Sequence, residues 1–267
     1  MRSRVLVSVV GVPLILLIIF WAPAWVLAAA LALLSAIAAF ELTRCVDTAG
    51  EGRVLTGGAV LGALGAVWLQ FQCVQWYGAL LVFYTLLAFA YAVCRAGAVR
   101  LQQVLTALFA AGALPYAFGA FLRLHDMGIH RAYLLLPLLF SFCSDTAAFF
   151  AGHAFGKHKL APRVSPHKTV EGAVGGLLGD IVGGLVFAFF VNAAFGERLD
   201  YLGIAVLGVG CSVIAQLGDL SFSLIKREFG VKDYGHLLPG HGGILDRFDS
   251  VTFVAPLVWL AMTLFRL

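Results

Sequence analysis

The chain contains 267 residues, of which 61% are hydrophobic and only 12% are charged, and its mean hydropathy is +0.96. Soluble domains contain roughly 45–50% apolar and about 25% charged residues, so this composition excludes a soluble globular domain. The 18 basic and 14 acidic residues give a net charge of +4, which does not point to a nucleic-acid partner.

The apolar residues fall in repeated blocks that are long enough to cross a hydrocarbon layer of about 30 Å as helices. The predicted fold class is all-α, a polytopic integral membrane protein with a single membrane domain over residues 1–267. We expect the basic, apolar N-terminus to remain as the first span rather than to be a cleaved signal peptide, because equally apolar blocks follow it. The nine expected spans are residues 4–22, 24–41, 56–73, 75–94, 101–122, 131–152, 171–195, 201–225 and 248–265.

The distribution of basic residues predicts the orientation of these spans, because Lys and Arg gather in cytoplasmic loops. A cytoplasmic N-terminus leaves only four of the 18 basic residues outside, namely Arg123, Arg131, Arg198 and Arg266. The same orientation puts the two longest polar loops, residues 153–170 and 226–247, in the cytoplasm. We therefore expect an active site that faces the cytoplasm.

Polar residues divide the chain into two parts with different expected roles. We expect residues 1–122 to form packing and anchoring helices, and residues 123–267 to form the catalytic helices and the cytoplasmic loops. Asp145, Asp180 and Asp219 lie in or beside apolar stretches of the second part. An unpaired charge there costs several kcal/mol, so we expect the chemistry in this part. The five cysteines lack the C-x-x-C spacing of a zinc site or redox pair.

One segment of the second part aligns three polar groups on one helix face. Asp219, Ser223 and Lys226 are spaced i, i+4 and i+7, which directs their side chains to the same side of a helix. A salt bridge that joins two helices would explain a single acid. Three aligned groups favour a binding or catalytic site.

The loop that follows carries glycines and acids. Gly240, Gly242 and Gly243 allow backbone N–H groups to approach a phosphate closely, and Asp246 and Asp249 share a face if a helix begins near them. A tight turn is the alternative for the glycines alone. Basic residues crowd around these acids and favour the phosphate hypothesis: Lys226, Arg227, Lys232 and Arg247. Of the seven histidines, His241 is the one that we expect to be functional.

The earlier polar loop predicts a second anion site. Ser165 and Pro166 resemble the N-cap and first residue of a helix, which would place Lys168 and Thr169 in its first turn. A lysine there opposes the helix dipole unless an anion binds beside it. The alternative is a basic loop that touches anionic lipid headgroups.

Small residues dominate the span after this loop and predict close helix packing: Gly172, Gly175, Gly176, Gly179, Gly183 and Gly184. Asp180 lies among them and either faces a metal site or forms a hydrogen bond across a helix interface. Asp145 is the stronger functional candidate because hydroxyl residues flank it.

Residues 223–249 read SLIKREFGVKDYGHLLPGHGGILDRFD, which resembles the signature of CDP-diacylglycerol synthases, also called phosphatidate cytidylyltransferases, without a departure. Residues 145–172 also resemble this family, which favours an S-P-x-K-T-x-E-G core. Both segments lie in the carboxyl-terminal half, and the first half matches only as apolar helices.

The resemblance implies transfer of a cytidylyl group from CTP to phosphatidate, with Mg²⁺ as the required cofactor. Asp219 and Asp246 are then the first choices for metal ligands, with Asp145, Asp180 and Asp249 as second choices, and a second cation is an open alternative. The catalytic group of residues comprises Ser223, Lys226, Arg227, Lys232 and His241. The expected substrate-binding residues are Ser165, Lys168, Thr169, Gly240, Gly242, Gly243 and Arg247.

The expected partners are therefore CTP, phosphatidate and membrane lipids, and the protein is expected in a bacterial inner membrane. The glycine stripes and the resemblance are compatible with a homodimer. Two alternatives stay open: a nucleotidyl- or phosphotransferase that acts on another lipid, and a polytopic transporter, although paired broken helices in both halves would be typical of a transporter.

Overall fold

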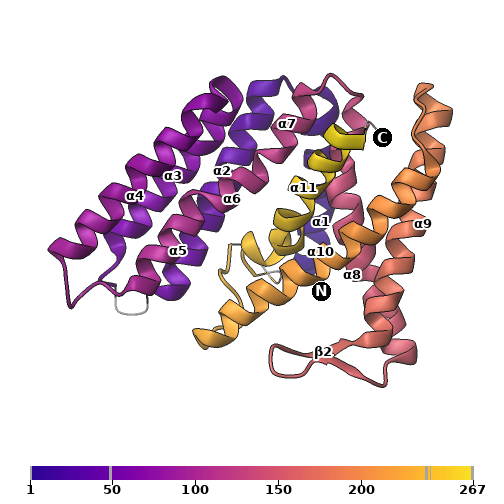
Figure 1. Cartoon of the computed structure of the whole chain (residues 1–267). Coiled ribbons are helices and arrows are strands. Elements are labelled where there is room, and N and C mark those ends of the chain that lie inside the picture. Colours follow the sequence, from indigo (N-terminus) through magenta and orange to yellow (C-terminus); the bar gives the residue numbers. More distant parts are fainter. Residues whose placement is uncertain (1, 48–49, 238–239, 241, 266–267) are drawn as a thin grey trace. The chain divides into compact units, whose positions relative to one another are not determined.

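A computed structural model describes residues 2–47, 50–237, 240 and 242–265 of the chain, with the side chains from residue 9 onward (Figure 1). Within these residues, eight helical stretches are long and apolar enough to cross a membrane. A further apolar helix, α1 (Arg2–Trp21), precedes them. The predicted all-α polytopic fold is confirmed, whereas the orientation of the spans stays a prediction.

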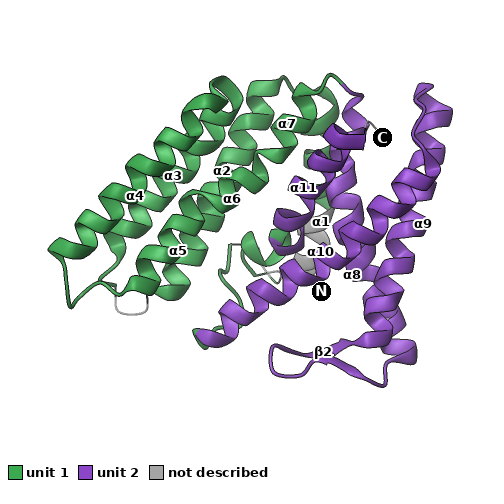
Figure 2. Cartoon of the chain, viewed as in Figure 1, with its two compact units in different colours: residues 1–128, 229–248 green, residues 129–228, 249–267 purple. Residues whose placement is uncertain are grey.

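The chain divides into two compact units (Figure 2), and unit 1 comprises residues 1–128 and 229–248. Its helices α2 and α3 pack closely because their facing residues are small: Ala28, Ala38 and Ala39 on α2, and Ala59, Ala63 and Ala66 on α3, have no exposed surface. After α1, the elements of this unit are α2 (Ala24–Val46), α3 (Arg53–Gln72), η1 (Val74–Trp76), α4 (Tyr77–Cys94), α5 (Leu101–Ala111), α6 (Ala113–Phe118) and α7 (Ala120–Asp126).

The span predicted at residues 101–122 is not one continuous helix. It breaks at Gly112 and Gly119 into α5, α6 and α7. The side-chain amide of Gln70 on α3 donates a hydrogen bond of 2.9 Å to the carbonyl of Pro115. A Cβ atom at Gly119 would overlap that amide, so glycine at this position leaves room for the Gln70 side chain between helices.

Unit 2 comprises residues 129–228 and 249–267. A Cβ atom at Gly175 or Gly179 on α9 would collide with Ala151 or Ala147 on α8, which confirms that the glycine stripe serves close packing. The elements of this unit are η2 (Arg131–Leu135), α8 (Leu136–Phe155), β1 (Lys159–Ala161), β2 (Ser165–Thr169), α9 (Val170–Phe195) and α10 (Tyr201–Glu228), followed by α11 (Leu245–Phe265), which belongs to this unit from residue 249 onward.

A short hairpin replaces the helix start that we predicted at Ser165 and Pro166. Strand β2 pairs antiparallel with β1, with Lys159 opposite Thr169 and Ala161 opposite Ser165. Helix α9 begins only at Val170, and the Thr169 hydroxyl accepts its capping hydrogen bond from the Gly172 N–H at 3.1 Å. The predicted cap at Ser165 is therefore wrong, and Lys168 and Thr169 precede the helix because pairing with β1 keeps them extended.

Candidate active site

Unit 2 contains a cavity of about 500 Å³ that α8, the hairpin, the start of α9 and α10 enclose. Four predicted residues line it, namely Asp145, Lys168, Thr169 and Asp219. It therefore brings together acids and bases from three separate stretches of sequence. Three further lining residues, His153, Lys159 and His167, were not predicted, although their position in a basic polar loop was a signal.

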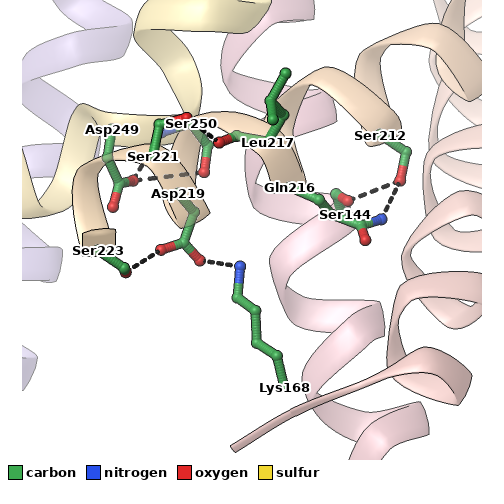
Figure 3. A network of polar contacts seen from close by, with 10 residues as sticks. All are labelled: Ser144, Lys168, Ser212, Gln216, Leu217, Asp219, Ser221, Ser223, Asp249 and Ser250. Atoms are coloured by element: carbon green, nitrogen blue, oxygen red, sulfur yellow. Dashed lines mark hydrogen bonds and ion pairs between the residues drawn. The ribbon is translucent and has the colours of Figure 1, made fainter. Parts of the chain in front are cut away.

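An ion pair joins the two sides of this cavity. The Lys168 ammonium on β2 contacts the Asp219 carboxylate on α10, and the Ser223 hydroxyl donates a hydrogen bond of 3.2 Å to the other oxygen of Asp219 (Figure 3). Both charged side chains are about three-quarters buried, with 25% and 23% exposed. The predicted helix face of Asp219 and Ser223 is thus confirmed.

Gln216, one turn before Asp219, fixes α10 to its neighbours. Its side-chain amide donates hydrogen bonds of 3.1 Å to the Ala173 carbonyl on α9 and to the Ser212 hydroxyl. Ser212 also shares a 2.9 Å hydrogen bond with Ser144 on α8 (Figure 3). Three helices are therefore tied together beside the Asp219 carboxylate, which limits the freedom of that side chain.

Three glycines let the backbone approach Thr169. A Cβ atom at Gly152 would lie 2.9 Å from the Thr169 hydroxyl oxygen, and one at Gly172 would lie 3.0 Å from it. A Cβ atom at Gly156 would lie 2.8 Å from the Thr169 methyl group. The wall of the cavity at Thr169 therefore tolerates only small residues on α8 and α9.

The other acids of unit 2 are placed differently. Asp249 on α11 interacts electrostatically with Asp219 and Asp145, and one of its oxygens accepts the Ser250 N–H at 2.7 Å. Asp180 is fully buried and is not among the residues that line the cavity. Among the described residues, no three acidic, histidine or cysteine side chains are grouped closely enough to hold a metal ion. The metal ligands stay predictions.

A second cluster lies in unit 1, where the 229–248 segment folds around Asp246. One oxygen of this carboxylate accepts hydrogen bonds from the N–H groups of Tyr234, at 2.8 Å, and Gly243, at 2.9 Å. Gly240 and Gly242 adopt positive φ angles of 78° and 84°, which glycine tolerates best. The Gly243 N–H is therefore engaged by Asp246 rather than pointing outward to a phosphate.

Glu41 on α2 is the residue that sequence reasoning missed. Its carboxylate is buried and accepts hydrogen bonds from the N–H groups of Ile244, at 3.1 Å, and Leu245, at 2.8 Å. A Cβ atom at Gly235 or Gly243 would collide with this carboxylate. A helix of residues 1–122, which we expected to serve packing and anchoring, thus holds the 229–248 segment and the start of α11.

The remaining predicted residues are more dispersed. Arg227 donates a 3.3 Å hydrogen bond to the Val164 carbonyl of the hairpin loop, and Lys226 interacts electrostatically with Asp249. Lys232 and Arg247 are exposed in unit 1, and His241 lies outside the described residues.

Comparison with known proteins adds a family assignment. The sequence profile of the cytidylyltransferase family matches residues 2–265. The chain is 48% identical over 131 residues to a phosphatidate cytidylyltransferase of Staphylococcus haemolyticus, a match that covers 49% of this chain and 48% of the relative. It is 43% identical over 162 residues to a phosphatidate cytidylyltransferase of Haemophilus influenzae, covering 58% of this chain and 56% of the relative. The chain thus spans about half the length of the curated relatives that it matches.

Proposed function

The chain belongs to the cytidylyltransferase family, and we propose that it transfers the cytidylyl group of CTP to phosphatidate, forming CDP-diacylglycerol and pyrophosphate. The observation that carries this proposal is the cavity in which Lys168 pairs with Asp219 in a chain of this family. The names of the relatives and the membrane-length helices support a lipid acceptor.

The reaction needs no protein nucleophile. A phosphate oxygen of phosphatidate bonds to the α-phosphorus of CTP, the bond from that phosphorus to the bridging oxygen breaks, and its electron pair leaves with pyrophosphate. Catalysis then consists of positioning and charge stabilisation. Lys159 and Lys168 line the cavity and supply ammonium groups for phosphate oxygens, while Lys226, Arg227 and Lys232 are proposed to stabilise the leaving pyrophosphate.

The carboxylates of the cavity fit a magnesium ion. Mg²⁺ is commonly held by one or two carboxylates together with substrate phosphates and water, and Asp145 and Asp219 line one cavity. We propose these two as ligands, with Ser223 beside them. A bound Mg²⁺ would supply charge neutralisation on the phosphates of CTP. Asp246 and Asp249 remain further proposed ligands, as does a second cation.

We also propose the location, orientation and assembly of the protein. It would lie in a bacterial inner membrane with its active site facing the cytoplasm, contact membrane lipids directly and form a homodimer. The bacterial relatives and the apolar helices support the membrane assignment.

The proposed function is tested with purified protein, phosphatidate and Mg²⁺, in parallel reactions with CTP labelled at the α- or the γ-phosphate. Cytidylyl transfer places the α-label in chloroform-soluble lipid and the γ-label in pyrophosphate. Asp219→Asn should abolish lipid labelling, and Glu51→Gln, which changes an exposed acid of unit 1, should not.

Other results would redirect the assignment. Lipid labelled by the γ-phosphate would indicate a kinase, which is the phosphotransferase alternative. If the α-label entered lipid only when another phospholipid was the acceptor, the chain would be a nucleotidyltransferase whose acceptor is not phosphatidate.

A further inference from the structure

Unit 1 contains a groove between α2 and α3 that the proposed chemistry has not used. It consists of two adjoining cavities of about 800 and 940 Å³, which share Phe40, Arg44 and Val60 as lining residues. The two helices lie side by side (Figure 1). Residues 231 and 233–237 of the 229–248 segment form another wall of the smaller cavity, which measures about 800 Å³.

The groove changes character along its length. At the end of α2 and the start of α3 it is lined by Arg44, Arg53 and Thr56. Farther along both helices it is lined by Leu33, Ile37 and Leu64. Leu33 and Leu64 are 59% and 36% exposed. The groove is thus cationic at one end and apolar at the other.

The length of the apolar part matches one leaflet of a bilayer. From Leu33 to Arg44, α2 rises about 16 Å at about 1.5 Å per residue, and half of a hydrocarbon core of about 30 Å is about 15 Å. A lipid whose headgroup lies at the arginines would therefore place an acyl chain beside Leu33 and Ile37.

The two arginines are available to an anion. Neither Arg44 nor Arg53 forms an ion pair within the described part of the chain, and Arg44 lies over the Phe40 ring at 5.7 Å. Guanidinium groups bind phosphate through paired hydrogen bonds. An anionic headgroup is the complementary ligand.

Three acids also border the groove. Glu41 is engaged by the Ile244 and Leu245 N–H groups, and one oxygen of Asp47 accepts hydrogen bonds from the Gly52 N–H and the Gln103 amide. Asp233 is exposed on the 229–248 segment. At the arginine end, Asp47 is the one acid that lines the larger cavity, so cationic groups predominate there.

We propose that this α2–α3 groove captures the phosphatidate substrate before it reacts, with its phosphate at Arg44 and Arg53 and one acyl chain along Leu33, Ile37 and Leu64. The phosphate then leaves the arginines to react at the unit 2 cavity. The proposal rests on the proposed function and assigns the lipid to unit 1. A phosphate monoester, which carries up to two negative charges, suits two guanidinium groups better than a phosphodiester or a zwitterionic headgroup does.

The headgroup is tested by kinetics in mixed micelles, in which the mole fraction of phosphatidate and the concentration of CTP are varied separately. Arg44→Gln and Arg53→Gln should each raise the KM for phosphatidate about tenfold or more and leave the KM for CTP unchanged, because a hydrogen bond to a charged group contributes about 1.5–3 kcal/mol. Arg44→Lys should recover part of the loss. Arg95→Gln removes an arginine of unit 1 that pairs with Glu51 and serves as the matched control.

The apolar end is tested by narrowing the groove. Ile37→Trp should lower turnover of long-chain phosphatidate while sparing dihexanoyl phosphatidate. Val82→Trp, at an exposed position on α4 outside the groove, should affect neither substrate.

Native mass spectrometry with phosphatidate, phosphatidylglycerol and phosphatidylcholine gives a readout that is independent of turnover. The wild-type chain should retain phosphatidate preferentially, and the Arg44→Gln/Arg53→Gln double variant should lose that preference. Equal retention of phosphatidylglycerol would overturn the proposal and indicate a binding site for anionic lipids in general. An unchanged KM for phosphatidate in an active double variant, or a raised KM for CTP, would also overturn it. A wild-type chain that is inactive but still retains phosphatidate preferentially would instead refute the proposed function and support the binding of phosphatidate in the groove.

Discussion

Lys168 on the hairpin and Asp219 on α10 form an ion pair inside the unit 2 cavity. We predict that Lys168→Ala lowers kcat/KM by about 10²-fold or more, since a preorganised group that stabilises transition-state charge contributes about that much. Lys168→Arg should retain part of the activity. Steady-state kinetics with separately varied CTP and phosphatidate measure the effect. A variant that unfolds more easily but turns over normally would show that the pair is only structural.

The Glu41 carboxylate makes two hydrogen bonds to backbone N–H groups at the start of α11. In Glu41→Gln only the amide oxygen can accept, and the amide N–H₂ would face the second donor. We expect a loss of about 1.5–3 kcal/mol in the free energy of unfolding, measured as a lower thermal unfolding midpoint in detergent. Hydrogen exchange at residues 242–248 should accelerate. Unchanged exchange there would contradict the assigned contact, and Glu51→Gln is the control.

The collision between a side chain at position 243 and Glu41 gives a separate prediction. Gly243→Ala should destabilise unit 1 and reduce turnover, because its Cβ atom would overlap the Glu41 carboxylate. The control is Gly78→Ala on α4, where a Cβ atom has nothing within 4 Å and where alanine favours the helix by about 1 kcal/mol. Thermal unfolding of both variants measures the contrast. Equal behaviour would mean that the segment can shift away from Glu41.

Thr169 caps the start of α9, whereas Ser165 does not. Thr169→Ala should lower the free energy of unfolding by about 1 kcal/mol, because it removes the hydroxyl that accepts the Gly172 N–H. Thr169→Ser should retain the cap. Ser165→Ala should change stability little, since Ser165 lies in β2. Thermal unfolding that is more sensitive to Ser165 than to Thr169 would support the helix start predicted from sequence.

Local patterns predicted the helices well. Long apolar blocks gave the spans, and the spacing of Asp219 and Ser223 gave their shared face, because both depend on residues a few positions apart. Lys168 and Asp219 were both predicted to belong to the active site, but the ion pair between them was not predicted. Sequence spacing cannot show that the hairpin contacts α10, because the two residues lie about fifty positions apart in the chain.

The errors and omissions have longer-range causes. The space beside Gly119 is filled by Gln70 of a different helix, and the start of α9 depends on pairing between β1 and β2. Glu41 was overlooked because a single acid near the end of a predicted span is typical of a membrane interface. Only the folded structure shows that its carboxylate accepts hydrogen bonds from Ile244 and Leu245 and so holds the start of α11 in place.

The contact between Glu41 and the start of α11 also constrains the order of folding during synthesis. Ile244 and Leu245 follow Glu41 by 203 and 204 residues, and translation adds roughly 5–20 residues per second. The ribosome therefore takes roughly 10–40 s to supply the donors after α2 has emerged. During that interval the carboxylate needs water, a proton or a temporary partner, and unit 1 acquires its final form only after residue 245 has been synthesised.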